Sequence, residues 1–141
     1  MDETVIEFFR HHSTHFLEMA LKNDKLERII HPDGYGKHSR SCGDTLEIFL
    51  TARNGGIHSA SFYTEGCIFT VACANTMIGM IEGKPVQDAW SITPQHLVDY
   101  LETLPEKEHH CAELAVNALR AALLDLKETE RQPWVKFYRK N

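Results

Sequence analysis

The chain has 141 residues, a length that suits one domain with a single modest core. Apolar residues make up 43% of it and charged residues 25%, as in water-soluble globular proteins, and its formal net charge of −5 argues against nucleic acid as the main partner. No apolar run approaches the roughly 20 residues that span a bilayer, so we expect no transmembrane helix. The acidic start "MDETVIEFF" is unlike a signal peptide, and we therefore expect a cytoplasmic protein.

The first third of the chain predicts a helix and then a loop. Apolar residues recur at spacings of three and four along residues 4–21, which is typical of one amphipathic helix, at Val5, Phe9, His12, Phe16 and Ala20. The stretch "HPDGYGKHSRSCG", residues 31–43, contains three glycines and a proline. We therefore expect residues 31–43 to form a loop.

The next segment, "DTLEIFLTARNGGIHSASFYT", predicts a β-hairpin. Its first half alternates apolar and other residues, as a half-buried strand requires, at Leu46, Ile48 and Leu50. Asn54-Gly55 is a strong signal for a two-residue hairpin turn, and residues 57–64 form the expected return strand. A further short strand is expected at residues 67–69.

The second half of the chain predicts helices. Residues 70–82 form the first of them, followed by Gly83 as a C-cap, with Val71, Ile78 and Ile81 as core positions. Thr93-Pro94 opens another helix that runs to about Leu104. After Pro105, one long helix buries a stripe that consists of Leu114, Ala115, Ala118, Leu119, Ala122 and Leu126. Strands early and helices late predict an α+β fold with helices packed on one face of the sheet.

The domain is expected to cover residues 1–128, followed by a basic, aromatic tail at 129–141. The last eleven residues, "RQPWVKFYRKN", contain four basic groups and no acidic one. Such a tail can dock on an acidic partner, or it can be a frayed terminus. Both interpretations remain open.

Three of the four cysteines lie where predicted elements meet. Cys42 precedes the first hairpin strand, Cys67 follows the second, and Cys111 lies near the start of the long helix, whereas Cys73 falls inside a helical pattern and is expected in the core. The predicted hairpin would bring its two ends, and hence Cys42 and Cys67, close together. In a reducing cytosol such cysteines are thiols, and their use is more often metal binding or catalysis than crosslinking.

Two other ligand types accompany these thiols, Asp44 after Cys42 and His110 before Cys111. Three soft thiolates suit zinc or an iron–sulfur cluster, although no C-x-x-C pair is present. The alternatives are buried apolar thiols, an Asp44 that stabilises a turn, and a Cys111–His110 nucleophile pair. Sequence neighbours on a helix point about 100° apart, which disfavours the nucleophile pair.

Four segments occur in an order that resembles the U-type iron–sulfur cluster scaffold family, the group of IscU and the N-terminal domain of NifU. They are "CGDTLEIFL", "EGCIFTVACANT", "EGKPVQDAWSIT" and "LPEKEHHCAELAVNALRAALLDLK", within residues 40–127. The resemblance implies an α+β fold with a small antiparallel sheet, for which we expect three strands.

The resemblance also implies a function and a ligand set. Cys42, Cys67 and Cys111 would bind a transient [2Fe-2S] cluster, with Asp44 and His110 as exchangeable ligands. The same residues would bind Fe²⁺ or Zn²⁺ in the cluster-free form. A cysteine desulfurase would deliver sulfur as a persulfide to Cys111, and the finished cluster would pass to apo iron–sulfur proteins. The expected protein is thus a scaffold and cluster carrier, not an enzyme.

Some residues depart from the family pattern. Housekeeping scaffolds carry Leu-Pro-Pro-Val-Lys before the His-Cys pair, the site read by a dedicated Hsp70 chaperone, where this chain has "LPEKE". We therefore do not expect the chaperone interaction. A zinc-bound, persulfide-accepting sulfurtransferase partner of a desulfurase is the main alternative, and a structural zinc adaptor is another. His110 and the short interval between Cys67 and Cys111 favour the scaffold.

Overall fold

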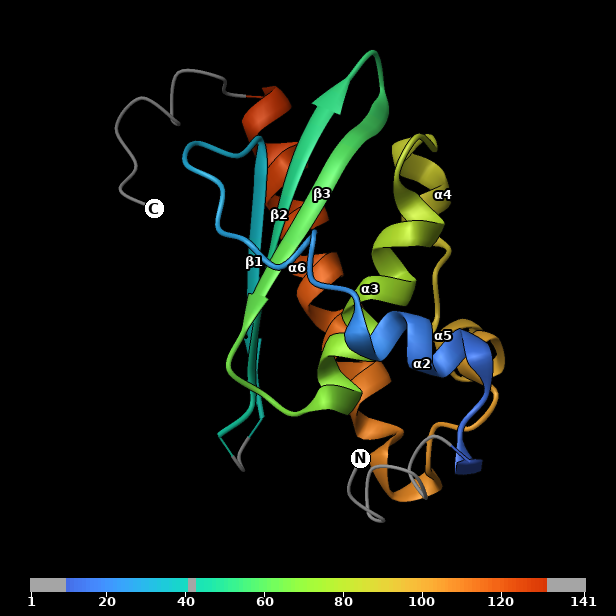
Figure 1. Ribbon diagram of the computed structural model, residues 1–141. Coiled ribbons are helices and arrows are strands. Elements are labelled where there is room, and N and C mark those ends of the chain that lie inside the picture. The colour runs from blue at the N-terminus through green and yellow to red at the C-terminus, as the bar shows by residue number, and fades with distance from the viewer. Residues whose placement is uncertain (1–9, 41–42, 132–141) are drawn as a thin grey trace.

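The computed structural model describes residues 10–40 and 43–131 (Figure 1). In chain order its elements are α2 (Thr14–Leu21), β1 (Gly34–Ser39), β2 (Thr45–Arg53), β3 (Gly56–Thr64), α3 (Ile68–Ile81), α4 (Val86–Trp90), α5 (Pro94–Leu101), the 3₁₀ turn η1 (Glu106–Glu108) and α6 (His110–Arg131). Within these residues, no helix has the length and apolar character needed to cross a membrane.

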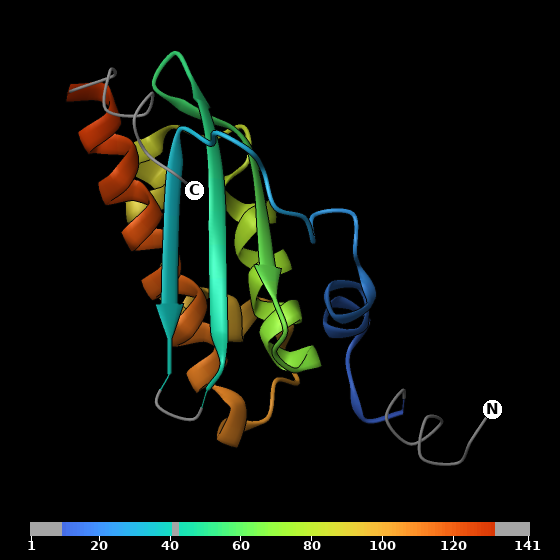
Figure 2. The same ribbon diagram turned by 90° about the vertical axis from the view of Figure 1, so that its left-hand side faces the viewer.

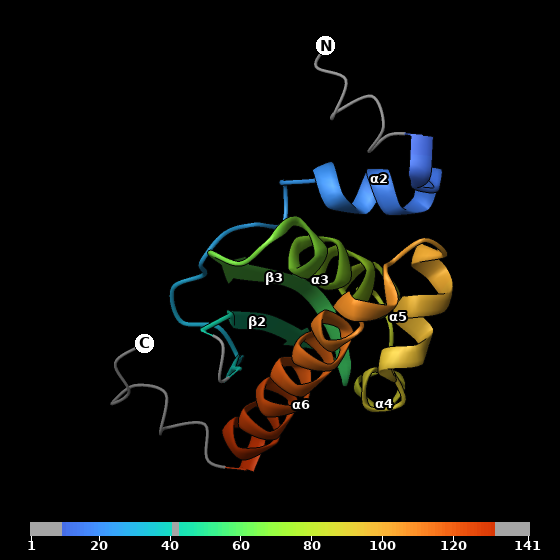
Figure 3. The ribbon, with the colours of Figure 1, turned by 90° about the horizontal axis from the view of Figure 1, so that it is seen from below.

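The three strands form one antiparallel sheet in the order β1-β2-β3. Figure 2 shows α6 and α3 behind this sheet, on one face, while no helix among residues 10–40 and 43–131 covers the other face. Seen from below, α2 lies against α3 on the side away from α6 (Figure 3). The predicted α+β fold, a small three-stranded antiparallel sheet with helices on one face, is confirmed.

The prediction of one helix over residues 4–21 is wrong, because α2 begins only at Thr14. Ser13 has an extended backbone, and its hydroxyl accepts a hydrogen bond from the Phe16 amide at 3.1 Å, so it caps α2. The same hydroxyl donates to the Leu101 carbonyl at 3.0 Å, which ties this break to the end of α5. Phe16 and Ala20 are buried as expected. Val5 and Phe9 lie outside the described residues.

The predicted loop at residues 31–43 is also wrong, because β1 occupies Gly34–Ser39. Its glycines allow α6 to lie directly on the strand. A Cβ atom on Gly34 would lie 2.6 Å from the Ala122 carbonyl oxygen, and one on Gly36 would overlap the backbone of Ala118 and Ala122. Glycine in a strand can mark a close backbone approach as well as a turn.

The hairpin is confirmed, and the short strand predicted after it is not. Asn54 and Gly55 have φ angles of 52° and 77°, the left-handed conformations that a tight hairpin turn requires. All three alternating residues of β2 are buried: Leu46, Ile48 and Leu50. Residues 67–69 are not a strand, because Cys67 is the N-cap of α3 and the helix begins at Ile68.

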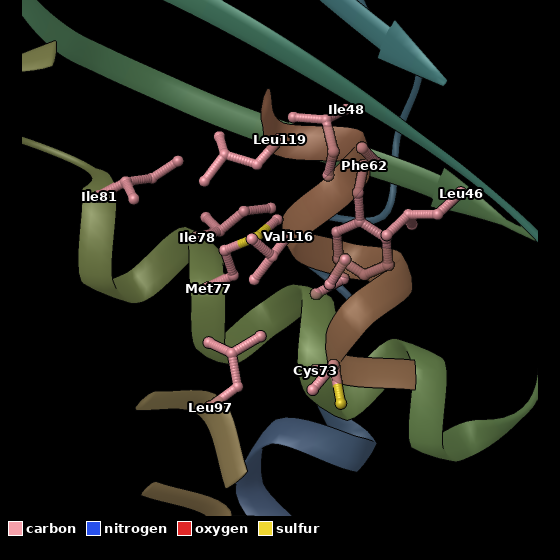
Figure 4. Packing of buried hydrophobic residues seen from close by; sticks show 14 of the residues in the cluster. Leu46, Ile48, Phe62, Cys73, Met77, Ile78, Ile81, Leu97, Val116 and Leu119 are labelled. Carbon is pink, nitrogen blue, oxygen red and sulfur yellow. The ribbon is translucent and has the colours of Figure 1, made fainter. Parts of the chain in front are cut away.

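Helices α3 and α6 supply most of the core beneath the sheet. Figure 4 shows Met77 and Ile78 of α3 packed beside Val116 of α6, close to the sheet residue Ile48. Every predicted stripe residue of α6 is at most 2% exposed. In α3, Ile78, Ile81 and Cys73 are buried as expected, whereas Val71 is only partly buried.

The ends of the later helices differ from the predicted ones. Thr93 caps α5 as expected, and its hydroxyl accepts from the His96 amide. The helix stops at Leu101, three residues early, because Glu102 has a φ angle of 59°. Helix α6 continues through residue 128 to Arg131. The division into residues 1–128 and 129–141 stays a prediction, and residues 132–141 lie outside the described part.

Both edges of the sheet are occupied along part of their length. Beside β3, the Phe62 amide donates to the Lys25 carbonyl at 2.9 Å, and the Glu27 amide donates to the Phe62 carbonyl at 2.9 Å. At β1, the Tyr35 amide donates to Asp125 of α6 at 2.8 Å. These contacts satisfy backbone groups that a sheet edge would otherwise present to solvent.

A methyl group on Gly36 should destabilise the fold, because it would force α6 away from β1. We expect Gly36→Ala to lower the free energy of unfolding by about 3 kcal/mol, at the upper end for overpacking. Gly79→Ala is the control, since Gly79 is an exposed helical residue with open space around it. It should raise stability by up to ~1 kcal/mol. Urea unfolding followed by circular dichroism measures both, and an unchanged Gly36→Ala midpoint would contradict the packing argument.

Candidate metal centre

The candidate centre lies where α3 and α6 begin. Cys67 is the N-cap of α3 and Cys111 is in the first turn of α6. The two helices pack together, and their N-terminal ends lie at the same end of the molecule (Figure 1). The turn before Cys67 is fixed by Thr64, whose hydroxyl donates to the Thr45 carbonyl at 2.7 Å and accepts from the Gly66 amide at 2.9 Å.

Three metal-binding side chains converge at this point, those of Cys67, Glu108 and Cys111. Their ligand atoms all lie within 4.8 Å of one another. The Cys111 thiol is 3.8 Å from Glu108 Oε2, with the geometry of a weak hydrogen bond. Cys67 is exposed, Glu108 is half-buried and Cys111 is fully buried. The group is therefore open to solvent on the Cys67 side and closed on the Cys111 side.

Thr70 connects the two sulfur atoms. Its hydroxyl donates to Cys111 Sγ at 3.5 Å and lies 3.7 Å from Cys67 Sγ. Thr70 is itself fully buried and lies one turn after Cys67 in α3. The Thr70 side chain therefore contacts both sulfurs from the core side. Its hydrogen bond to Cys111 Sγ favours a negative charge on that sulfur.

The surroundings of Cys111 keep its thiol protonated in the absence of a cation. Burial raises the pKa of Cys111 to about 12; the Thr70 hydrogen bond opposes the shift, and the nearby Cys67 and Glu108 add to it. A metal ion among these groups would reverse the effect, because it stabilises thiolates directly. Burial also raises the pKa of Cys73 far above its usual range, consistent with an inert core thiol.

Asp44 lies immediately before β2, outside this group. Its backbone carbonyl accepts from the Arg40 amide at 2.8 Å. With Arg28, Lys37 and Tyr63 it lines a cavity of about 420 Å³. In the part of the chain that the structure describes, the group of three ligand atoms does not include Asp44.

His110 is adjacent to the group without belonging to it. Its Nδ1 is 3.0 Å from the Lys107 carbonyl oxygen, and its Nε2 is 3.6 Å from Glu108 Oε2. The neighbouring His109 contacts the Leu104 carbonyl at 3.2 Å. Of the three residues of the centre, His110 is thus paired with Glu108. Cys42 lies outside the described residues, so its position beside Cys67 stays a prediction.

Glu108 and Thr70 were not among the predicted site residues. Each lies three positions from a site cysteine, Glu108 before Cys111 and Thr70 after Cys67. On a helix, residues three apart share a face. A spacing of three residues from a site cysteine is therefore the sequence feature that indicates both residues. For Glu108 this feature is inconspicuous, because the charged stretch "EKE" is typical of a solvent-exposed surface.

Comparison with known proteins gives one family. Residues 20–132 match the model of the NifU-like N terminal domain. The protein is 32% identical over 99 residues to the iron-sulfur cluster assembly scaffold protein IscU 1 of Archaeoglobus fulgidus, covering 70% of this chain and 65% of that protein. It is 33% identical over 88 residues to IscU of Haemophilus influenzae, covering 62% of this chain and 69% of the relative. The chain thus spans slightly less than two thirds of the Archaeoglobus protein.

Solved structures share the fold. A scaffold protein described for the SUF system of Fervidobacterium islandicum superposes with a TM-score of 0.67 at 19% identity, covering 79% of this chain and 95% of that one. A NifU-like N-terminal structure from Brucella abortus gives 0.65 at 17% identity, covering 82% and 94%. Since the family model matches most of the chain and includes both described site cysteines, this protein belongs to the NifU-like N-terminal domain family.

Proposed function

We propose that this protein is a scaffold on which an iron–sulfur cluster is assembled and from which it is passed to apo-proteins. The observation that carries the proposal is the meeting of Cys67 and Cys111, from two different helices, within 4.8 Å. Soft thiolate ligands select iron–sulfur clusters and zinc. The similarity to relatives named as IscU scaffold proteins supports the same function.

The proposed cargo is a [2Fe-2S] cluster bound by Cys42, Cys67 and Cys111. Asp44 or His110 completes the ligand set. Because an oxygen or imidazole ligand exchanges more readily than a thiolate, a cluster with only three thiolates is easier to give away. Before assembly the same residues bind Fe²⁺ or Zn²⁺. The cytoplasmic location expected from the sequence stays a prediction.

Cys111 is the proposed acceptor of sulfur from a cysteine desulfurase. Its thiolate attacks the terminal sulfur of the enzyme's persulfide. The S–S bond of the donor breaks, a new S–S bond forms on Cys111, and the donor cysteine leaves as a thiolate, so there is no net oxidation. A cation held beside Cys67 assists this step, because metal binding displaces the thiol proton. With "LPEKE" at residues 104–108, no dedicated Hsp70 chaperone is part of the proposal.

Anaerobic reconstitution with Fe²⁺ and a cysteine desulfurase tests the scaffold. The wild-type protein should develop the absorption spectrum of a [2Fe-2S] cluster, and Cys67→Ser and Cys111→Ser should lose it. Cys73→Ala should keep it, because Cys73 is a buried core thiol. A stable persulfide on Cys111 with zinc retained and no cluster would instead support the zinc-bound sulfurtransferase partner.

Alkylation of the metal-free, reduced protein tests the burial of Cys111. Iodoacetamide should modify exposed Cys67 faster than buried Cys111. Because the pKa of Cys111 is raised to about 12, its thiolate fraction should grow about tenfold per pH unit between pH 7 and 10. Peptide mapping by mass spectrometry resolves the two sites. A Cys111 rate that levels off below pH 9 would contradict the raised pKa.

Removal of the Asp44 carboxylate should slow cluster release. We expect Asp44→Ala to transfer its cluster to an apo-ferredoxin more slowly than the wild type, because a weakly held oxygen ligand is the entry point for the acceptor's thiolate. Exposed Asp88→Ala controls for the lost charge. Transfer is followed by circular dichroism in the visible range, and faster release from Asp44→Ala would count against the role of Asp44.

A further inference from the structure

We propose that Glu108 is a direct ligand of the divalent iron or zinc ion that Cys67 and Cys111 bind, so that a carboxylate oxygen joins these two sulfur ligands in the metal site of the cluster-free protein. The inference rests on the proposed function, because it concerns the metal that enters the same site before the cluster is built. It adds a ligand that the expected set of Cys42, Asp44, Cys67, His110 and Cys111 does not contain.

The distances fit a metal site. In a tetrahedral site with metal–sulfur bonds of 2.3 Å and metal–oxygen bonds of 2.0 Å, sulfur and oxygen lie about 3.5 Å apart and two sulfurs about 3.8 Å apart. The measured distance from Cys111 Sγ to Glu108 Oε2 is 3.8 Å. All three ligand atoms lie within 4.8 Å of one another, so small side-chain rotations are enough to close them around one ion.

The position of the carboxylate is set by the backbone. Glu108 ends the turn η1, where its amide donates to the Pro105 carbonyl at 2.8 Å and the His109 amide donates to the Glu106 carbonyl at 3.1 Å. Glu108 precedes Cys111 by three residues, and the path of the chain from η1 into the first turn of α6 brings the two side chains to 3.8 Å of each other. The turn therefore presents the carboxylate to the cysteines before any ion arrives, which lowers the cost of ordering it on binding.

The charge around Glu108 favours a cation. Its side chain is 21% exposed, and among the described residues the basic group that pairs with it is His110, at 3.6 Å. This distance is longer than the 2.7–2.9 Å of a charge-assisted hydrogen bond. A carboxylate held beside two sulfurs with such a weak counter-charge gains more from a divalent ion than from its present partner.

A structural role is the competing explanation. A carboxylate near the N-terminal end of α6 also interacts favourably with the helix dipole. Such a role would affect the stability of the metal-free protein and leave its metal affinity unchanged. The two explanations therefore differ in what Glu108→Gln changes, since glutamine keeps the shape of the side chain and removes its charge.

Cobalt titration of the reduced, metal-free full chain measures the site directly. When Co²⁺ binds thiolates, its absorption spectrum gains a sulfur-to-metal charge-transfer band. The ligand-field bands of the bound Co²⁺ indicate the geometry of the site. Changing outer-shell partners alone costs 10–100-fold in metal affinity, so we expect Glu108→Gln to weaken Co²⁺ binding by at least about tenfold. Competition with Zn²⁺ should show the same loss of affinity in the variant, and X-ray absorption of the zinc form should show a changed shell of oxygen ligands.

Glu106→Gln is the matched control, because Glu106 is an exposed residue of the same turn with the same charge. It should bind Co²⁺ within about twofold of the wild type, on the scale of exposed charge pairs. Thermal melting of the metal-free proteins detects a structural effect. Unchanged affinity and spectrum in Glu108→Gln, or no thiolate charge-transfer band in the wild type, would overturn the proposal. Failure of the wild type to form a cluster despite normal Co²⁺ binding would instead overturn only the scaffold function.

Discussion

The contact between α6 and β1 is the constraint on which the rest of the structure depends. Gly34 and Gly36 leave no Cβ between the strand and the helix, and Ala118 and Ala122 are the small residues that meet them. This close contact fixes the position of α6 beneath the sheet and beside α3. The N-terminal end of α6 then lies beside that of α3, and Cys111 comes to lie beside Cys67. A packing contact among small residues therefore determines the distance between two reactive sulfurs.

The two cysteines occupy different environments although they share one site. Cys67 precedes its helix and is exposed, whereas Cys111 is inside its helix and buried. Thr70 bridges them from the core side, and Glu108 approaches from the turn before α6. In the metal-free protein Cys111 is thus a protected thiol, and Cys67 is the sulfur that solvent reaches directly. A cation bound beside exposed Cys67 would favour the thiolate of Cys111, which is the sulfur acceptor in the proposed function.

Much of the fold could be predicted from local sequence, and the exceptions have physical causes. The Asn54-Gly55 hairpin follows from one turn signal, and the buried stripe of α6 follows from one periodicity. The glycines of β1 predict a loop, because local sequence does not reveal that a helix lies on top of them. The break at Ser13 depends on its bond to Leu101, 88 residues away. At the site, cysteines attract attention by their chemistry, whereas Glu108 resembles any surface glutamate until its neighbours in space are known.

The occupied sheet edges determine how other proteins can approach this one. Lys25 and Glu27 cover β3 around Phe62, and Asp125 binds the amide of Tyr35 on β1. A partner cannot extend the sheet at these points by adding its own strand, because the backbone groups are already engaged. Recognition through main-chain pairing is thereby discouraged, both for visiting proteins and for further copies of this chain. At these points a partner can bind only through side chains, and the end of the molecule where α3 and α6 begin presents the metal-binding ones.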